Sequence, residues 1–258
     1  MVPHAGVQGK ASRYHPAMAG RVWALLGSGE FQPWAEEVDR WMLDRARPGP
    51  VLILPTASAP EGDEVFDRWG RMGLEHYLRL GVDAEVVPMK RREDADLPDL
   101  AAHLEGAAAV FFSGGNPGYL ASTLTGSRFW RLLLANLDRG LAYGGCSAGV
   151  AALGERAAWR LHRSTFWPGL AVFPGTNLAP HWDATDRYLP GLSGALIDHL
   201  GPPYRLVTVD EDTAMIGDGR RWSVIGAGRV QVLTGGAPTD HRAGESFELD
   251  LTSAGSRR

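Results

Sequence analysis

A serine among small residues, Ser147 in the stretch Gly145–Gly149 (GCSAG), is the first feature of this chain that could do chemistry. It fits the pattern G-x-S-x-G, in which a serine projects from a sharp turn between a strand and a helix. The amide of the next residue, Ala148, then points at the oxyanion that develops on a substrate carbonyl. Because an apolar run precedes Ser147 and a helical pattern follows it, we predict a nucleophile here. The alternative is a plain glycine-rich turn.

A second glycine turn, Ser113–Asn116 (SGGN), ends another apolar run. Open α/β sheets bind ligands beyond the carboxyl ends of their strands, so both turns could face one crevice. Gly115 could supply a second oxyanion amide, because glycine lets the backbone approach a substrate closely. Gly114 and Asn116 belong to the same candidate binding turn. The alternative is a tight turn in which Asn116 caps a helix.

His181 is the candidate base. An unperturbed histidine titrates near pH 6.5, so it can accept the serine proton and return it to the leaving amine. It follows a proline-containing loop that could bring the side chain to the crevice, and His162 is its competitor. The remaining histidines have no motif around them and are assigned to the surface: His4, His15, His76, His103, His199 and His241.

Apolar runs alternate with amphipathic helical patterns through the first part of the chain. This alternation predicts an α/β fold with a mostly parallel central sheet and helices on both faces. Strands are expected at Arg21–Gly27, Pro50–Pro55, Asp83–Val87, Ala107–Phe112 and Leu141–Gly145. Helices are expected at Pro33–Ala46, Val65–Leu80, Leu97–Leu104, Pro117–Leu124, Arg128–Arg139 and Ser147–Leu153.

The C-terminal third contains short apolar strands separated by Gly and Asp, which we interpret as antiparallel additions to the same domain. They are expected at Arg205–Val209, Ala214–Ile216, Trp222–Ile225 and Arg229–Leu233. We predict one domain over residues 21–250, with flexible tails at 1–20 and 251–258.

Composition excludes several classes of function. A formal net charge of -4 and a pI near 6.1 argue against a nucleic-acid or membrane surface as partner. The single cysteine allows no internal disulfide, and no apolar run of membrane-spanning length or secretory core occurs, so we expect a cytoplasmic protein. No His, Asp or Glu cluster has metal-ligand spacing, and Gly27–Gly29 lacks the third glycine of a dinucleotide turn. We therefore expect neither metal nor cofactor.

Six segments together resemble peptidase family S51, the cyanophycinases and aspartyl dipeptidases, within the flavodoxin-like, class I glutamine-amidotransferase-like fold. The resemblance rests on LLGSGE, VLILPTAS, FFSGGNPGYL, GGCSAGVAALG, the Pro-His-Trp at 180–182 and VDEDTAMI. It implies a Ser147 nucleophile, a His181 base, an acidic third member, and oxyanion donors at Gly115 and Ala148. It also implies a small peptide or amide as substrate, and it favours a homodimer.

The sequence departs from the family where its acid usually lies, because His162–Trp167 (HRSTFW) contains no carboxylate. We expect a substitute to orient His181, and name Glu155 and Asp183, with a backbone carbonyl or water as the fallback. A weaker orienter would slow catalysis. The competing hypotheses are a non-catalytic binding or regulatory protein, and an amidotransferase-like hydrolase of a non-peptide amide. Pro117, beside the substrate pocket, also differs from the family and leaves the substrate open.

Cys146 precedes Ser147, and a shift of the turn by one residue would make it the nucleophile. We expect Ser147→Ala to lower hydrolysis by at least about 10³-fold with little loss of fold, because triad residues act as one unit. Steady-state rates of the variant measure the loss of hydrolysis, and thermal unfolding measures the effect on the fold. Full activity in Ser147→Ala together with loss of activity in Cys146→Ala would show that our register is wrong.

Overall fold

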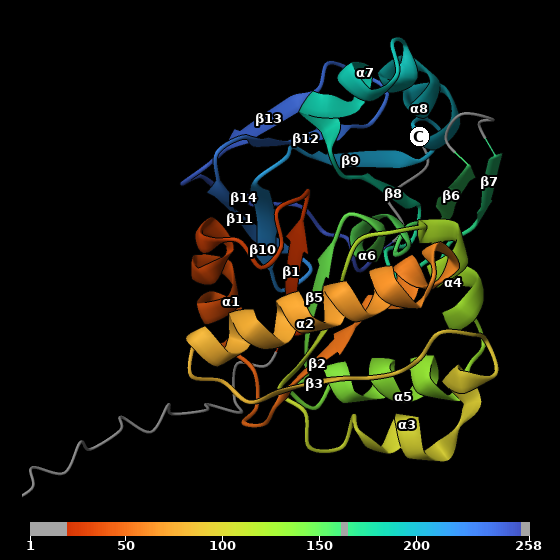
Figure 1. The fold of residues 1–258 in the computed structure, drawn as a ribbon. Coiled ribbons are helices and arrows are strands. Elements are labelled where there is room, and N and C mark those ends of the chain that lie inside the picture. Colours follow the sequence, from red (N-terminus) through yellow and green to blue (C-terminus); the bar gives the residue numbers. More distant parts are fainter. Residues whose placement is uncertain (1–19, 161–164, 254–258) are drawn as a thin grey trace, which may run out of the picture.

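An eight-stranded sheet forms the centre of the protein in the computed structural model, which describes residues 20–160 and 165–253 (Figure 1). Its order is β14-β11-β10-β1-β5-β4-β2-β3. The last five strands in this order are parallel and the first three run antiparallel. The parallel strands are β1 (Val22–Leu26), β2 (Val51–Leu54), β3 (Ala84–Val86), β4 (Ala109–Phe112) and β5 (Ala142–Cys146). The antiparallel strands are β10 (Thr213–Gly217), β11 (Arg221–Gly226) and β14 (Ser246–Glu248).

Helices cover both faces of this sheet, which confirms the predicted α/β architecture. Successive residues of β1 alternate between two hydrophobic clusters, with Trp23 and Leu25 in one and Ala24 and Leu26 in the other. One cluster includes side chains from α1 (Glu36–Leu43) and α2 (Asp63–Arg79). The opposite cluster includes side chains from α3 (Pro98–Ala102), α4 (Pro117–Leu124), α5 (Arg128–Leu137) and α6 (Ala148–Ala151).

A second sheet, of order β13-β12-β9-β8, lies beyond the carboxyl ends of the central strands, next to α7 and α8 (Figure 1). Strands β8 and β9 are parallel, and the chain joins them through these two helices. The sequence analysis missed β8, both helices and the β6–β7 hairpin. The bounds are β8 (Thr176–Ala179), β9 (Arg205–Val209), β12 (Arg229–Leu233), β13 (Thr239–Arg242), α7 (Thr185–Tyr188), α8 (Leu192–Leu200), β6 (Arg156–Arg160) and β7 (Thr165–Pro168).

Two expectations need correction. Leu251, assigned to a flexible tail, is fully buried and its amide donates to the carbonyl of Gly219, so the packed domain continues beyond residue 250. His76, assigned to the surface, is also buried, and its Nε2 lies 2.7 Å from a carboxylate oxygen of Asp39. Residues 1–19 and 254–258, most of the two expected tails, lie outside the described residues. Within the described part of the chain, none of the helices combines the length and apolarity needed to cross a bilayer.

Helix α6 packs tightly on the end of β4, and this contact fixes the turn that carries Ser147. A Cβ atom at Gly149 would lie 2.3 Å from the carbonyl oxygen of Phe112, well inside contact distance. At Gly194, in α8, an added Cβ would meet nothing within 4 Å. A methyl group would therefore clash with the backbone at Gly149 but would be accommodated at Gly194.

We expect Gly149→Ala to destabilise the protein by about 1–3 kcal/mol, because a methyl group would force α6 away from β4. The matched variant Gly194→Ala should be neutral or stabilising by up to about 1 kcal/mol, because alanine favours helix. Thermal unfolding of both variants tests the difference. Equal melting temperatures for the two would contradict the tight packing of α6.

Candidate active site

Ser147 occupies a strained turn between β5 and α6, as the sequence predicts. Its backbone has φ 51° and ψ −107°, in a region that residues with side chains rarely adopt. The turn is held in place because the Ser147 amide donates to the carbonyl of Leu26 in β1, at 3.1 Å. Strained conformations of this kind persist when the surrounding structure determines them, and they cluster at active sites. The geometry is that of a nucleophile elbow rather than a relaxed turn.

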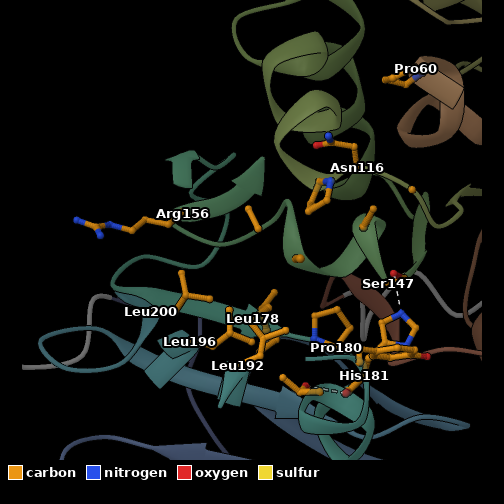
Figure 2. Close-up of a pocket in the computed structure, with 18 of the residues that line it drawn as sticks. Pro60, Asn116, Ser147, Arg156, Leu178, Pro180, His181, Leu192, Leu196 and Leu200 are labelled. Carbon is orange, nitrogen blue, oxygen red and sulfur yellow. Dashed lines mark hydrogen bonds between the residues drawn. The ribbon is translucent and has the colours of Figure 1, made fainter. Parts of the chain in front are cut away.

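His181 lies next to this serine. Its Nε2 is 2.8 Å from the Ser147 hydroxyl oxygen, so the residue expected to be the base lies within hydrogen-bond reach of the serine (Figure 2). The residue follows β8 and has a left-handed backbone, and its carbonyl accepts from the hydroxyl of Thr185 at 2.8 Å. The competing His162 lies outside the described residues.

Glu211, a residue that the sequence analysis did not single out, binds the other ring nitrogen. Its Oε1 is 3.0 Å from His181 Nδ1. A histidine with a carboxylate at Nδ1 carries its proton there, which leaves Nε2 free to accept from the serine. Glu211 also accepts from the Tyr188 hydroxyl at 2.8 Å and from the Arg187 guanidinium at 3.2 Å. Ser147, His181 and Glu211 therefore form a continuous hydrogen-bonded chain.

The two carboxylates expected to orient His181 do not do so. Glu155 accepts from the amide of Gly175 at 2.8 Å, and so secures a loop instead. Asp183 accepts from the backbone amide of Glu211 at 2.7 Å, which makes it a support for the residue that does orient the imidazole. A carboxylate does lie against His181, but it is neither of the two that we expected.

Parallel strand pairing explains why Glu211 reaches His181. Ala179 of β8 is the register partner of Thr208 in β9, so the chain leaves both strands at neighbouring points. His181 and Glu211 each come two residues after the end of their strand. The acidic run after an apolar strand was the available signal, but the pairing of β8 with β9 was not visible in the sequence.

Two backbone amides lie beside Ser147 at the ends of neighbouring strands. Neither the amide of Gly115 nor that of Ala148 donates a hydrogen bond to any described residue of the chain. Gly115 has φ 139°, and a Cβ there would lie 2.4 Å from the backbone of Ala57, so only glycine fits. The side chain of Asn116 accepts from the amide of Tyr119 and caps α4, which was the alternative assignment for this residue.

Glu30, in the turn that follows β1, contacts the same turn and was also missed from the sequence. Its side chain is 6% exposed, and its Oε1 accepts from the amide of Gly114 at 2.9 Å. A Cβ at Gly114 would lie 3.5 Å from the Ser147 Cβ, so the two turns touch. The ends of three neighbouring strands, β1, β4 and β5, therefore hold the serine and the candidate oxyanion donors together.

Cys146 is buried, whereas the adjacent Ser147 is partly exposed. The side chain is fully buried in the hydrophobic cluster that contains α1 and α2. Burial raises the pKa of the thiol well above its usual value, and the nearby Glu30 raises it further. Because the thiolate is the reactive form of cysteine, this thiol is poorly suited to act as a nucleophile.

The electrostatics of Glu211 favour its ionised form. Burial alone would raise the pKa of this carboxyl, but hydrogen bonds from His181 and Tyr188 outweigh it, and the pKa lies below the usual 4.5. The carboxylate is therefore charged at neutral pH and can stabilise a protonated imidazole.

A cavity of about 630 Å³ opens beside Ser147 and His181 (Figure 2). Its lining includes Gly115, Asn116 and Ala148. Over residues 20–160 and 165–253, no three or more His, Cys, Asp or Glu side chains come together in a way that could hold a metal ion. The serine, the imidazole and the backbone amides are the groups at this cavity that suit acyl transfer.

Comparison with known proteins agrees with a peptidase on this α/β fold. Cyanophycinase of Trichormus variabilis is 25% identical over 225 residues, which cover 81% of this chain and 72% of that protein. Cyanophycinase of Synechococcus elongatus is 26% identical over 237 residues, covering 87% and 71%. The crystal structure of a peptidase from an acI-B1 Actinobacterium superposes with a TM-score of 0.80 at 28% identity. It covers 89% of this chain and 98% of that one.

The fold and the site thus define a hydrolase of the peptidase class. The family model of peptidase family S51 matches residues 23–200, and the chain belongs to this family. The match ends before Glu211, so the third member of the hydrogen-bonded chain rests on the geometry described above.

We expect Tyr188→Phe to raise the pKa of Glu211, because the substitution removes one hydrogen bond to its charged form. A carboxylate with a lowered pKa contributes stability above its unfolded pKa, and this is lost as pH falls through its folded pKa. In Tyr188→Phe, the contribution of Glu211 ionisation to the folding stability at neutral pH should therefore be smaller.

Carboxyl-carbon NMR titration measures the shift directly. Tyr204→Phe, which removes a tyrosine hydroxyl that is not among the groups bonded to the Glu211 carboxylate, is the matched control and should leave the titration unchanged. A Glu211 pKa that stays constant or falls in Tyr188→Phe would contradict the assignment.

Proposed function

We propose that this protein is a serine peptidase that hydrolyses an amide bond in a small peptide or amino-acid-derived substrate. The proposal rests on one observation above all, the chain of hydrogen bonds from Glu211 through His181 to Ser147. The two distances, 3.0 Å and 2.8 Å, are within the hydrogen-bond range that a Ser-His-acid triad requires. Membership of peptidase family S51 supports the same class of reaction.

In the proposed acylation step, the Ser147 oxygen attacks the substrate carbonyl carbon while its proton passes to His181 Nε2. The amides of Gly115 and Ala148 donate to the resulting oxyanion. The imidazolium then gives its proton to the leaving nitrogen as the carbon–nitrogen bond breaks, which releases the amine. In deacylation, a water molecule gives a proton to His181 and attacks the acyl-enzyme carbonyl carbon. The bond to the Ser147 oxygen then breaks, the serine takes the proton back from His181, and the acid is released.

Glu211 acts through His181 in this scheme. Its carboxylate holds the imidazole with the proton on Nδ1, and it stabilises the imidazolium that forms when Ser147 is deprotonated. Asp183 and Tyr188 hold Glu211 in place through its amide and its Oε1, respectively. These contacts make the acid part of a preformed site.

The non-catalytic alternative is less well supported. It was motivated by the lack of an acid in His162–Trp167, and Glu211 provides a carboxylate from elsewhere in the chain. An amidotransferase-like hydrolase would use the same serine, so only its substrate separates it from the peptidase. The homodimer and the cytoplasmic location stay predictions from the sequence.

We expect Glu211→Gln to lower kcat by roughly 10³ to 10⁴-fold, because an amide holds the wrong tautomer and cannot stabilise the imidazolium. Glu155→Gln is the matched control, since glutamine can still accept from Gly175, and its rate should be close to wild type. Asp183→Asn should fall between the two. Peptide hydrolysis by the variants measures these rates.

Labelling by a fluorophosphonate tests the proposal independently of the substrate. The probe should modify Ser147 in the wild-type protein, more slowly in Glu211→Gln, and not in Ser147→Ala. Equal labelling rates for wild type and Glu211→Gln would contradict the role given to the acid. No labelling of Ser147 would overturn the proposed function.

A further inference from the structure

The cavity beside the candidate triad extends into an apolar trough. It begins at Ser147 and His181 and runs toward β6, where Arg156 marks its far end (Figure 2). The floor consists of Leu178 from β8 and three leucines of α8. Small apolar residues from α6 and β6, Ala151 and Ala158, line it as well. We use the name leucine trough for the part of the cavity lined by Leu178, Leu192, Leu196 and Leu200.

The floor of the leucine trough is fixed. Leu192, Leu196 and Leu200 are spaced four residues apart and share one face of α8. They are only 7%, 7% and 4% exposed, because they pack in one cluster with Ala179 and Leu206. A rigid apolar surface beside the serine is preorganised for an apolar group and loses little entropy on binding.

Charged side chains other than His181 enter the cavity lining only at exposed positions. The Arg156 guanidinium lies over the Tyr204 ring at 5.4 Å and donates to the carbonyl of His199 at 3.3 Å. Figure 2 shows its side chain pointing away from the leucines. Glu61, the other charged lining residue besides His181, is exposed.

The hydroxyl groups that line the cavity are already engaged. Thr185 donates to the carbonyl of His181, and Tyr188 donates to Glu211. A carboxylate or guanidinium placed against the four leucines would be desolvated, and these side chains offer it no compensating partner, which is strongly unfavourable. An aliphatic or aromatic side chain would instead exchange water for leucine contacts.

We propose that the leucine trough is the subsite for an apolar side chain of the substrate, so that the enzyme cleaves small peptides with an aliphatic or aromatic residue next to the scissile bond in preference to acidic or basic ones. This inference rests on the proposed function, because it uses Ser147 as the nucleophile. A cavity of about 630 Å³ holds a ligand of dipeptide to tripeptide size. The leucines and Ser147 line one continuous cavity of this size, so the recognised side chain belongs to a residue close to the cleaved bond.

Two matched substrate sets test the preference with the purified full-length protein. In the first, leucine, phenylalanine, aspartate or arginine provides the acyl group of a coumarylamide. In the second, the same four residues follow alanine in a dipeptide. We expect kcat/KM for the apolar members to exceed that for the charged members by at least about tenfold in one set, the usual scale for a hydrophobic pocket. The set that shows the preference identifies the side of the bond that occupies the trough.

Variants of Leu196 connect the preference to the trough. Leu196→Ala should lower kcat/KM for the leucine and phenylalanine substrates about tenfold while fluorophosphonate labelling of Ser147 stays at the wild-type rate. Leu196→Arg should improve cleavage of the aspartate substrate relative to leucine. Asp198→Ala, an exposed position of the same helix that does not line the cavity, is the control and should keep the wild-type preference. If Leu196→Arg does not fold, the substrate preference of Leu196→Ala alone tests the role of the trough.

The outcomes separate this inference from the proposed function. Labelling of Ser147 with equal or better cleavage of charged substrates in both sets overturns the inference alone, and so does labelling without cleavage of any apolar substrate. An unchanged preference in Leu196→Ala also overturns it. If Ser147 is not labelled and no substrate is cleaved, the proposed function fails and the inference fails with it.

Discussion

The imidazole of His181 joins the two sheets of this protein at a single point. On one side it meets Ser147, which the central sheet presents, and on the other it meets Glu211, which follows a strand of the second sheet. Neither sheet holds all three groups. The site therefore depends on how the second sheet is seated over the carboxyl ends of β1, β4 and β5, where the turns that carry Glu30, Gly114 and Ser147 meet (Figure 1).

Backbone constraints keep this junction in place. Ser147 is held at positive φ by its bond to β1, and Gly115 can only approach the 3₁₀ helix Pro55–Glu61 because it lacks a side chain. Gly149 lets α6 rest on the carbonyl end of β4. Three small or strained positions thus allow three strand ends to converge within contact distance. Larger residues at the two glycines would separate the serine from the candidate oxyanion donors.

Much of the central sheet follows from local sequence. Strands such as β2 and β4 are short apolar runs because both of their faces are covered by helices. Such runs can be predicted from the sequence. The serine turn could also be predicted from local sequence, because a strand, small residues and a helical pattern follow one another directly. Ser147 could be named in advance because a local pattern and a family resemblance coincided there, whereas the choice of His181 depended mainly on the resemblance.

The second sheet was harder to predict because its strands carry buried polar residues. Thr176 and Asn177 make β8 look like a loop, yet both are fully buried, and the Asn177 side chain bonds to the carbonyl of Leu200. Without β8 there was no reason to place Thr208 beside Ala179, and so no reason to bring Glu211 to His181. Glu155 and Asp183 were chosen because they lie near Ser147 or His181 in sequence. Long-range pairing determined the actual partner.

The crossover from β8 to β9 separates recognition from chemistry. Its two ends are fixed by strand pairing and carry His181 and Glu211, whereas its middle contains α8, whose leucines face the cavity. The middle of the crossover can therefore change in sequence or length while both ends keep their register. Such an arrangement would let descendants of one ancestral chain acquire different substrates by remodelling a single helix.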